Sequence, residues 1–240
     1  MKKSAILILL LFLLVFFVVE FDLKIDKNLT TTTTVPAISY RTVSLKVPAV
    51  DNDGNGVVTN LMVSVQPGQG RVLTDVNNLL FWVDTQYSIR TAQRVAQDVL
   101  KNNLTGVDLI YSIDTNASLI EGPSAGAALT IATIAAVEDK NLNQSVMITG
   151  TINPDGTIGP IGAVAEKAKA SKDVGATLFL VPTGQGTEVS YKPTKSCERM
   201  GPILYCTTKY VTETNDISKS VGISVKEVST IDEALKYFLI

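Results

Sequence analysis

The chain has 240 residues, of which 45% are hydrophobic and 18% are charged, so it is long enough to bury one substantial core. Its formal net charge of −2, with basic residues scattered along the sequence, gives no basic patch of the kind that binds nucleic acid. The absence of histidine excludes every catalytic triad that depends on an imidazole base.

The first predicted element is a hydrophobic anchor helix. Lys2 and Lys3 precede an unbroken apolar run over residues 5–19, and Glu20 follows it. Lysines before such a run are typical of a membrane anchor whose N-terminus stays in the cytoplasm, and no small-residue cleavage site follows here. We therefore expect a single-pass membrane protein anchored by residues 1–23, with the remaining chain outside the cytoplasm. Cleavage of the anchor would make the protein secreted.

A linker and several strands are predicted next. Residues 24–39 contain a threonine run, which is typical of a flexible linker. The folded domain, residues 40–240, opens with an alternating strand and the turn "DNDGNG", which lacks the full pattern of a calcium-binding loop. Two strands around the "PGQG" turn at residues 67–70 then predict a hairpin, because the helix that a phosphate-binding glycine loop requires does not follow.

The rest of the domain alternates between helices and strands. Residues 88–103 predict an amphipathic helix with five apolar residues on one face: Ile89, Ala92, Val95, Ala96 and Val99. Further strands are expected over residues 107–114, 145–152 and 176–182, and further helices over residues 163–174 and 231–240. This irregular alternation predicts a single α+β domain with α/β-like character.

The stretch "EGPSAG", residues 121–126, places one serine at the start of an alanine-rich helix. Pro123 suits the first helical position, where its missing N–H costs nothing. Ser124 then lies in the first turn, where free backbone N–H groups and the helix dipole stabilise developing negative charge. Ser124 is therefore a candidate nucleophile, and the alternative is a serine that only caps the helix.

The candidate base is a lysine of the helix predicted over residues 163–174. Lys169 has charged neighbours one turn away, whereas Lys167 lies on a seam of small and apolar residues. The seam consists of Ala163, Val164, Ala170 and Ser171. Desolvation lowers the pKa of a lysine from about 10.4, so that a buried lysine can be neutral and accept a proton. Because the chain has no histidine, a neutral Lys167 is the predicted base for Ser124.

These residues carry a resemblance to a known family. Residues 61–239 resemble the proteolytic domain of Lon proteases, because "EGPSAG" matches the family's nucleophile motif and "GPIGAVAEKAKAS" matches its general-base motif. The separation of 43 residues between Ser124 and Lys167 also matches the family's spacing. The resemblance implies a Lon-type serine endopeptidase that uses these two residues as a catalytic dyad.

Three further residues are expected around the dyad. The backbone N–H of Ala125, with that of Ser124, lies at the helix start and is an expected donor to the oxyanion. The resemblance implies that Thr149 hydrogen-bonds Lys167 and orients it. Glu121 stands where the family has an acidic residue, and it either shapes the site or faces solvent.

The chain also departs from the family pattern. Thr151 stands where the family has an acidic residue, and no nucleotide-binding motif occurs, so the ATPase module of typical Lon enzymes is missing from this sequence. Residues 184–221 form a longer segment than the family's usual loop and predict an inserted hairpin. Its two cysteines, Cys197 and Cys206, either form a disulfide or remain free thiols.

The leading hypothesis is a membrane-anchored Ser/Lys endopeptidase that hydrolyses unfolded or flexible proteins without its own ATPase, and without a metal or another cofactor. One alternative is a catalytically silent Lon-like binding or assembly module. Another is a proteolytic subunit that works with a separate ATPase, which the outward orientation disfavours because ATP is scarce outside the cytosol. A homo-oligomeric ring is implied by the resemblance alone, and nucleic acid is not expected as a partner.

Overall fold

The computed structural model describes residues 40–75, 80–81, 83–114, 119–120 and 122–240. The predicted anchor over residues 1–23 and the predicted linker over residues 24–39 lie outside these ranges. Within the described ranges, no helix is both long enough and apolar enough to cross a bilayer.

The larger sheet has four strands in the order β1-β2-β5-β3. These strands are β1 (Arg41–Val50), β2 (Gly56–Pro67), β5 (Val107–Asp114) and β3 (Val72–Thr74). β2 is antiparallel to both of its neighbours, whereas β3 is parallel to β5. The predicted hairpin around residues 67–70 is therefore wrong, because β5 separates β2 from β3.

A buried carboxylate explains why the chain crosses β5 at this point. The Asp108 side chain of β5 is fully buried and accepts hydrogen bonds from the backbone N–H groups of Gln69 and Arg71, each at 2.9 Å. The Arg71 guanidinium also donates to it, and this interaction, together with the two backbone hydrogen bonds, lowers the pKa of Asp108 to about 2. The loop is thus fastened to β5 and cannot fold back against β2.

A second sheet has three parallel strands in the order β13-β10-β7. They are β7 (Val146–Ile148), β10 (Leu178–Pro182) and β13 (Ser224–Val228). Two short pairs accompany the sheets: β4 (Leu80–Phe81) with β6 (Leu119–Ile120), and β8 (Thr151–Ile152) with β9 (Ile158–Gly159). The mixture of parallel and antiparallel strands with helices agrees with the predicted α+β class.

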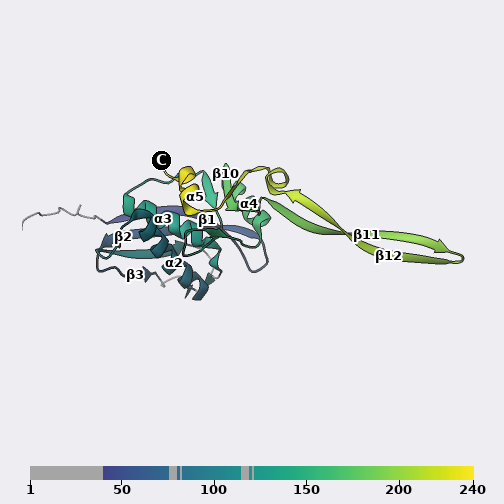
Figure 1. Ribbon diagram of the computed structural model, residues 1–240, viewed down its shortest axis with the longest axis horizontal. Coiled ribbons are helices and arrows are strands. Elements are labelled where there is room, and N and C mark those ends of the chain that lie inside the picture. The colour runs from purple at the N-terminus through teal and green to yellow at the C-terminus, as the bar shows by residue number, and fades with distance from the viewer. Residues whose placement is uncertain (1–39, 76–79, 82, 115–118, 121) are drawn as a thin grey trace, which may run out of the picture. The chain divides into compact units, whose positions relative to one another are not determined.

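A long hairpin is formed by β11 (Thr187–Met200) and β12 (Ile203–Asp216), within the segment for which the sequence predicts an insertion. Figure 1 shows it extending well beyond the two sheets. Its two ends meet at the body of the domain, where the N–H of Ile217 donates to the carbonyl oxygen of Gly186 at 3.1 Å. Cys197 and Cys206 are paired directly across the hairpin and form a disulfide.

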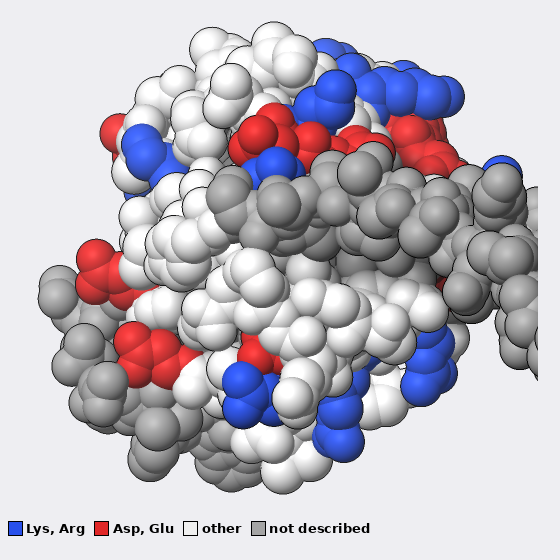
Figure 2. Space-filling model, turned by 90° about the vertical axis from the view of Figure 1, so that its left-hand side faces the viewer, with Lys and Arg blue, Asp and Glu red and all other residues white. Residues whose placement is uncertain are grey.

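Figure 2 shows the side of the domain that faces away from the hairpin. Basic and acidic side chains both occur on this side; they lie against each other at the upper right of the view and are separated by uncharged surface elsewhere. Among the described residues, no group of three or more Cys, Asp or Glu side chains is arranged to hold a metal ion.

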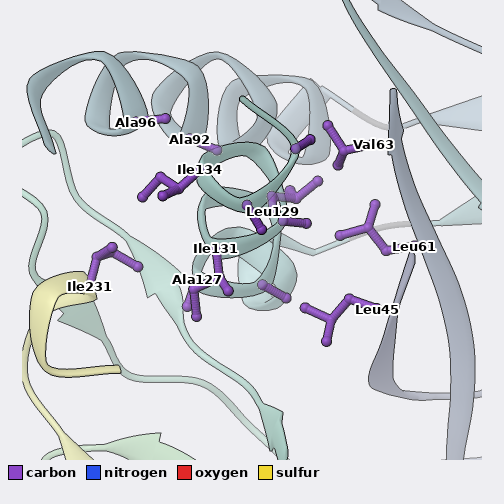
Figure 3. Packing of buried hydrophobic residues seen from close by; sticks show 14 of the residues in the cluster. Leu45, Leu61, Val63, Ala92, Ala96, Ala127, Leu129, Ile131, Ile134 and Ile231 are labelled. Carbon is purple, nitrogen blue, oxygen red and sulfur yellow. The ribbon is translucent and has the colours of Figure 1, made fainter. Parts of the chain in front are cut away.

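The core is built around one helix, α3 (Gly126–Glu138). Its residues from Gly126 to Ala136 are all buried, because α2 (Val83–Leu100), α5 (Ile231–Phe238) and the strands β1 and β2 surround it. Figure 3 shows Leu129 and Ile134 of α3 among side chains from these neighbouring elements. A helix that is covered on every side needs apolar residues all round, which accounts for its alanine-rich and isoleucine-rich sequence.

Candidate active site

Ser124 lies in a short 3-10 turn, η2 (Pro123–Ala125), which leads directly into α3. Ser124 and Ala125 are half-buried, whereas the helix that follows is buried. A Cβ atom at Gly126 would lie 2.7 Å from the backbone nitrogen of Ile152, so only glycine lets η2 approach β8 this closely. The serine is thus held at the junction between the surface and the core.

The backbone on both sides of Ser124 is fixed by hydrogen bonds from distant segments. The N–H of Gly150 donates to the Ser124 carbonyl oxygen at 2.9 Å. On the other side, the Asp84 carboxylate accepts from the N–H of Gly122 at 3.0 Å, and the Thr85 hydroxyl donates to the Gly122 carbonyl oxygen at 3.5 Å. Asp84 and Thr85 therefore belong to the site, although the sequence analysis missed them.

Lys167 lies in α4 (Val164–Asp173) and is only 3% exposed. Burial without compensation disfavours the charged ammonium, and it lowers the pKa of Lys167 from 10.5 to about 8. Lys169, two residues further on, is exposed. Among the described residues, no carboxylate forms an ion pair with Lys167, so desolvation acts on its pKa unopposed.

The position of α4 depends on a glycine in β2. A Cβ atom at Gly56 would overlap the carbonyl oxygen of Glu166 and would lie 3.0 Å from the Cβ of Ala170. The helix that carries Lys167 therefore rests directly on the backbone of β2. Both α4 and η2 also contact β1, so the same sheet supports the candidate base and the candidate nucleophile.

Thr149 is fully buried and follows β7. Its hydroxyl donates to the backbone carbonyl oxygen of Ser124 at 3.3 Å, so the hydrogen bond that the structure gives it is to the serine segment. No hydrogen bond joins Ser124 Oγ to Lys167 Nζ, two atoms that the structure does describe; such contacts often tighten only when substrate binds. Glu121 lies outside the described residues.

Comparisons with known proteins show which family the domain resembles. The family described as "Lon protease (S16) C-terminal proteolytic domain" matches residues 84–215, a range that contains Ser124, Thr149 and Lys167. The Lon protease of Lachnoclostridium phytofermentans is 26% identical over 192 residues, which cover 77% of this chain and 20% of that protein.

Two further relatives match over shorter stretches. The archaeal Lon protease of Methanocaldococcus jannaschii is 29% identical over 111 residues, 43% of this chain and 17% of that protein. The Lon protease 2 of Bacillus subtilis is 38% identical over 63 residues, 26% of this chain and 11% of that protein. The matches thus cover a fifth or less of each relative. The family match spans more than half of this chain. The chain therefore belongs to the Lon protease (S16) C-terminal proteolytic domain family.

Proposed function

We propose that this domain is a serine-type endopeptidase in which Ser124 is the nucleophile and Lys167 is the general base. The observation that carries the proposal is the burial of Lys167, which brings its pKa to about 8. Burying an ammonium without a partner destabilises a fold, so a binding module gains nothing from it. A base for a serine, in contrast, needs a neutral amine near the working pH.

The proposed reaction has two halves. As Ser124 Oγ attacks the peptide carbonyl carbon, its proton passes to the neutral Lys167 Nζ, and first-turn N–H groups at Ser124 and Ala125 stabilise the oxyanion. Lys167 then gives that proton to the departing amine, leaving an ester on Ser124. Water attacks the ester, its proton passes to Lys167, and the restored Ser124 hydroxyl takes that proton as the acid product leaves.

The proposed substrates are proteins with unfolded or flexible segments. These 240 residues contain no nucleotide-binding motif that could supply work for unfolding, so cleavage has to wait until the substrate opens. We further propose that residues 1–23 anchor the chain in a membrane with the domain outside the cytoplasm, as lysines before an apolar run suggest. A ring of several copies, as the family resemblance implies, is part of the same proposal.

The test is covalent labelling of Ser124 by a serine-directed acylating inhibitor, followed by mass spectrometry of the full chain. We expect rapid labelling of the wild type, at least 100-fold slower labelling of Lys167→Ala, and an unchanged rate in Lys169→Ala, whose side chain is exposed. The labelling rate should rise with pH along a limb centred near 8, because Lys167 must lose a proton before it can accept one.

A different result would favour the catalytically silent module. In that case Ser124 would react no faster than an ordinary surface serine, and the Lys167→Ala substitution would make no difference. A limb centred near 10.4, the usual value for a solvated lysine, would instead contradict the role of desolvation.

A further inference from the structure

The β11–β12 hairpin exposes large hydrophobic side chains, a kind of side chain that the rest of the domain mostly buries. Of the fourteen large hydrophobic side chains that are exposed in the described chain, eight lie on this hairpin. They are Val189, Tyr191, Met200, Ile203, Leu204, Tyr205, Tyr210 and Val211. A two-stranded ribbon is only marginally stable without a covering layer, so such a concentration of uncovered apolar surface indicates a binding role.

The strand register assigns these residues to faces. Residues paired directly across an antiparallel ribbon project from the same face, and successive residues alternate between faces. Because Tyr191 pairs with Thr212 and Pro193 pairs with Tyr210, one face of the half nearest the body carries a continuous stripe. We call it the apolar face; it consists of Val189, Tyr191, Pro193 and Tyr210.

The opposite face of the same half is charged. It carries Glu188, Lys192, Lys209 and Glu213, together with one apolar residue, Val211. The two faces therefore differ in chemistry, although both are exposed to a similar degree.

The apolar face ends at a pocket beside α4, the helix that carries Lys167. This pocket has a volume of about 310 Å³ and is lined by residues 161–164 on one side and by residues 187–189 of β11 on the other. Val189 belongs both to the apolar face and to the pocket wall. Glu188 of the opposite face also contributes to the lining. Val164, the first residue of α4, lines the pocket as well, so the pocket lies against the N-terminal end of the helix that carries Lys167 one turn further on.

The pocket is held in place by a bridging side chain. The Gln185 side chain accepts from the N–H of Ile161 at 2.9 Å and donates to the carbonyl oxygen of the same residue at 2.7 Å. The Glu227 carboxylate accepts from the N–H groups of Gly184 and Gly186 at 2.9 and 2.8 Å. The base of the hairpin is thus fastened to the loop that precedes α4.

We propose that the apolar face is a docking surface for extended, unfolded segments of the substrate protein, which lie along the hairpin and lead into the pocket beside α4. This inference rests on the proposed function, because it names where the substrate of that reaction binds. Unfolded chains expose the apolar side chains that folded proteins bury, and their free backbone groups can pair with the open edge of a ribbon. An exposed face with two tyrosines, one valine and one proline, on a ribbon with an open edge, matches both features.

The first experiment removes the hairpin. In the full chain carrying Ser124→Ala, residues 187–216 are replaced by two glycines that join Gly186 to Ile217, which are already hydrogen-bonded to each other. Binding to fluorescently labelled, reduced and carboxymethylated lactalbumin, which stays unfolded, is measured by anisotropy. We expect the dissociation constant to rise at least tenfold, while the melting temperature of the domain stays within a few degrees.

The second experiment uses matched residues on the two faces. Tyr210→Thr and Val189→Thr change the apolar face, whereas Tyr205→Thr and Val211→Thr change the same residue types on the opposite face. Val189 and Val211 are each 53% exposed, so exposure does not distinguish them. We expect a threefold or larger loss of lactalbumin binding from the first two variants and no change from the other two.

The outcomes separate this inference from the proposed function. Binding is measured on a chain that cannot turn over, so a silent enzyme with a working hairpin still gives the expected loss. Equal lactalbumin binding with and without the hairpin would overturn the docking surface. So would a fall in oligomer size on deletion with no change in lactalbumin affinity, because the hairpin would then cover a second copy of the chain.

Discussion

Leu129 in α3 and Leu204 in β12 are the same residue type in opposite surroundings. Leu129 is fully buried between helices and strands, whereas Leu204 is 60% exposed near the hairpin tip. The body of the domain uses apolar residues to hold its elements together, and the hairpin presents them to a partner. The difference teaches that an apolar residue contributes to the stability of the fold only where other elements cover it.

The largest expected effect is on the rate of peptide cleavage, because both candidate catalytic residues lie in the body of the domain and not in the hairpin. Ser124→Ala and Lys167→Ala should each reduce cleavage of both a short peptide and an unfolded protein by about 10⁴-fold, because the two residues act as one unit. For the same reason the double variant should be no worse than either single variant. Initial rates with both substrates provide the measurement, and Lys169→Ala, on the exposed side of α4, should remain active. A comparable loss in Lys169→Ala would contradict the assignment of the base.

The second largest effect is the difference in the free energy of unfolding between variants of Leu129 and Leu204. Leu129→Ala should lower the free energy of unfolding by about 3–5 kcal/mol, because it leaves a cavity in a closely packed core. Leu204→Ala should change it by less than about 0.5 kcal/mol, because no cavity forms at an exposed position. Urea unfolding of both variants measures the difference. Equal losses would mean that Leu204 is covered in solution and that the hairpin has a structural partner.

The smallest effect concerns Lys167, the one buried cation among the residues that the structure describes. The pKa of Lys167 is about 8 in the folded protein and near 10.5 when unfolded, so the unfolded chain binds more protons between these values and stability rises with pH across that window. Below pH 8 the folded state carries the whole cost of the buried charge, about 3 kcal/mol. Lys167→Met should therefore stabilise the domain by about this amount at pH 7.

Urea unfolding at two pH values checks whether the stability of the wild type rises with pH relative to that of Lys167→Met. The advantage of Lys167→Met should shrink as the pH rises from 8 and should vanish above about 10.5, where the lysine is neutral in both states. A methionine variant that is less stable than the wild type at pH 7 would show that Lys167 has a compensating partner in solution.

Both candidate catalytic residues could be found from the sequence, because each signal lies within one or two helical turns. Proline at the first helical position marked Ser124, and the seam of small residues marked Lys167. The sequence also predicts a helix over residues 88–103 with one apolar face, and α2 packs the residues of that face into or against the core. The α+β class followed in the same way from the local periodicity of the chain.

The features that sequence reasoning missed depend on contacts between distant residues. α2 begins at Val83 and not near residue 88, and Asp84 in its first turn binds Gly122, which is 38 positions away. The course of the chain after β2 depends on Asp108, which no local pattern connects to Arg71. The hydrogen bond from Thr149 to the Ser124 carbonyl oxygen is likewise set by how the segment between β7 and β8 lies against η2.

Gly56 shows that a reaction can be governed from a position that has no functional group. The absent side chain sets the distance between β2 and α4, and any larger residue would have to push the helix and its lysine away from the sheet. A shift of about 1 Å in a reacting group can cost about 100-fold in rate. We therefore expect that a larger residue at position 56 would slow the proposed reaction although Ser124 and Lys167 were both still present.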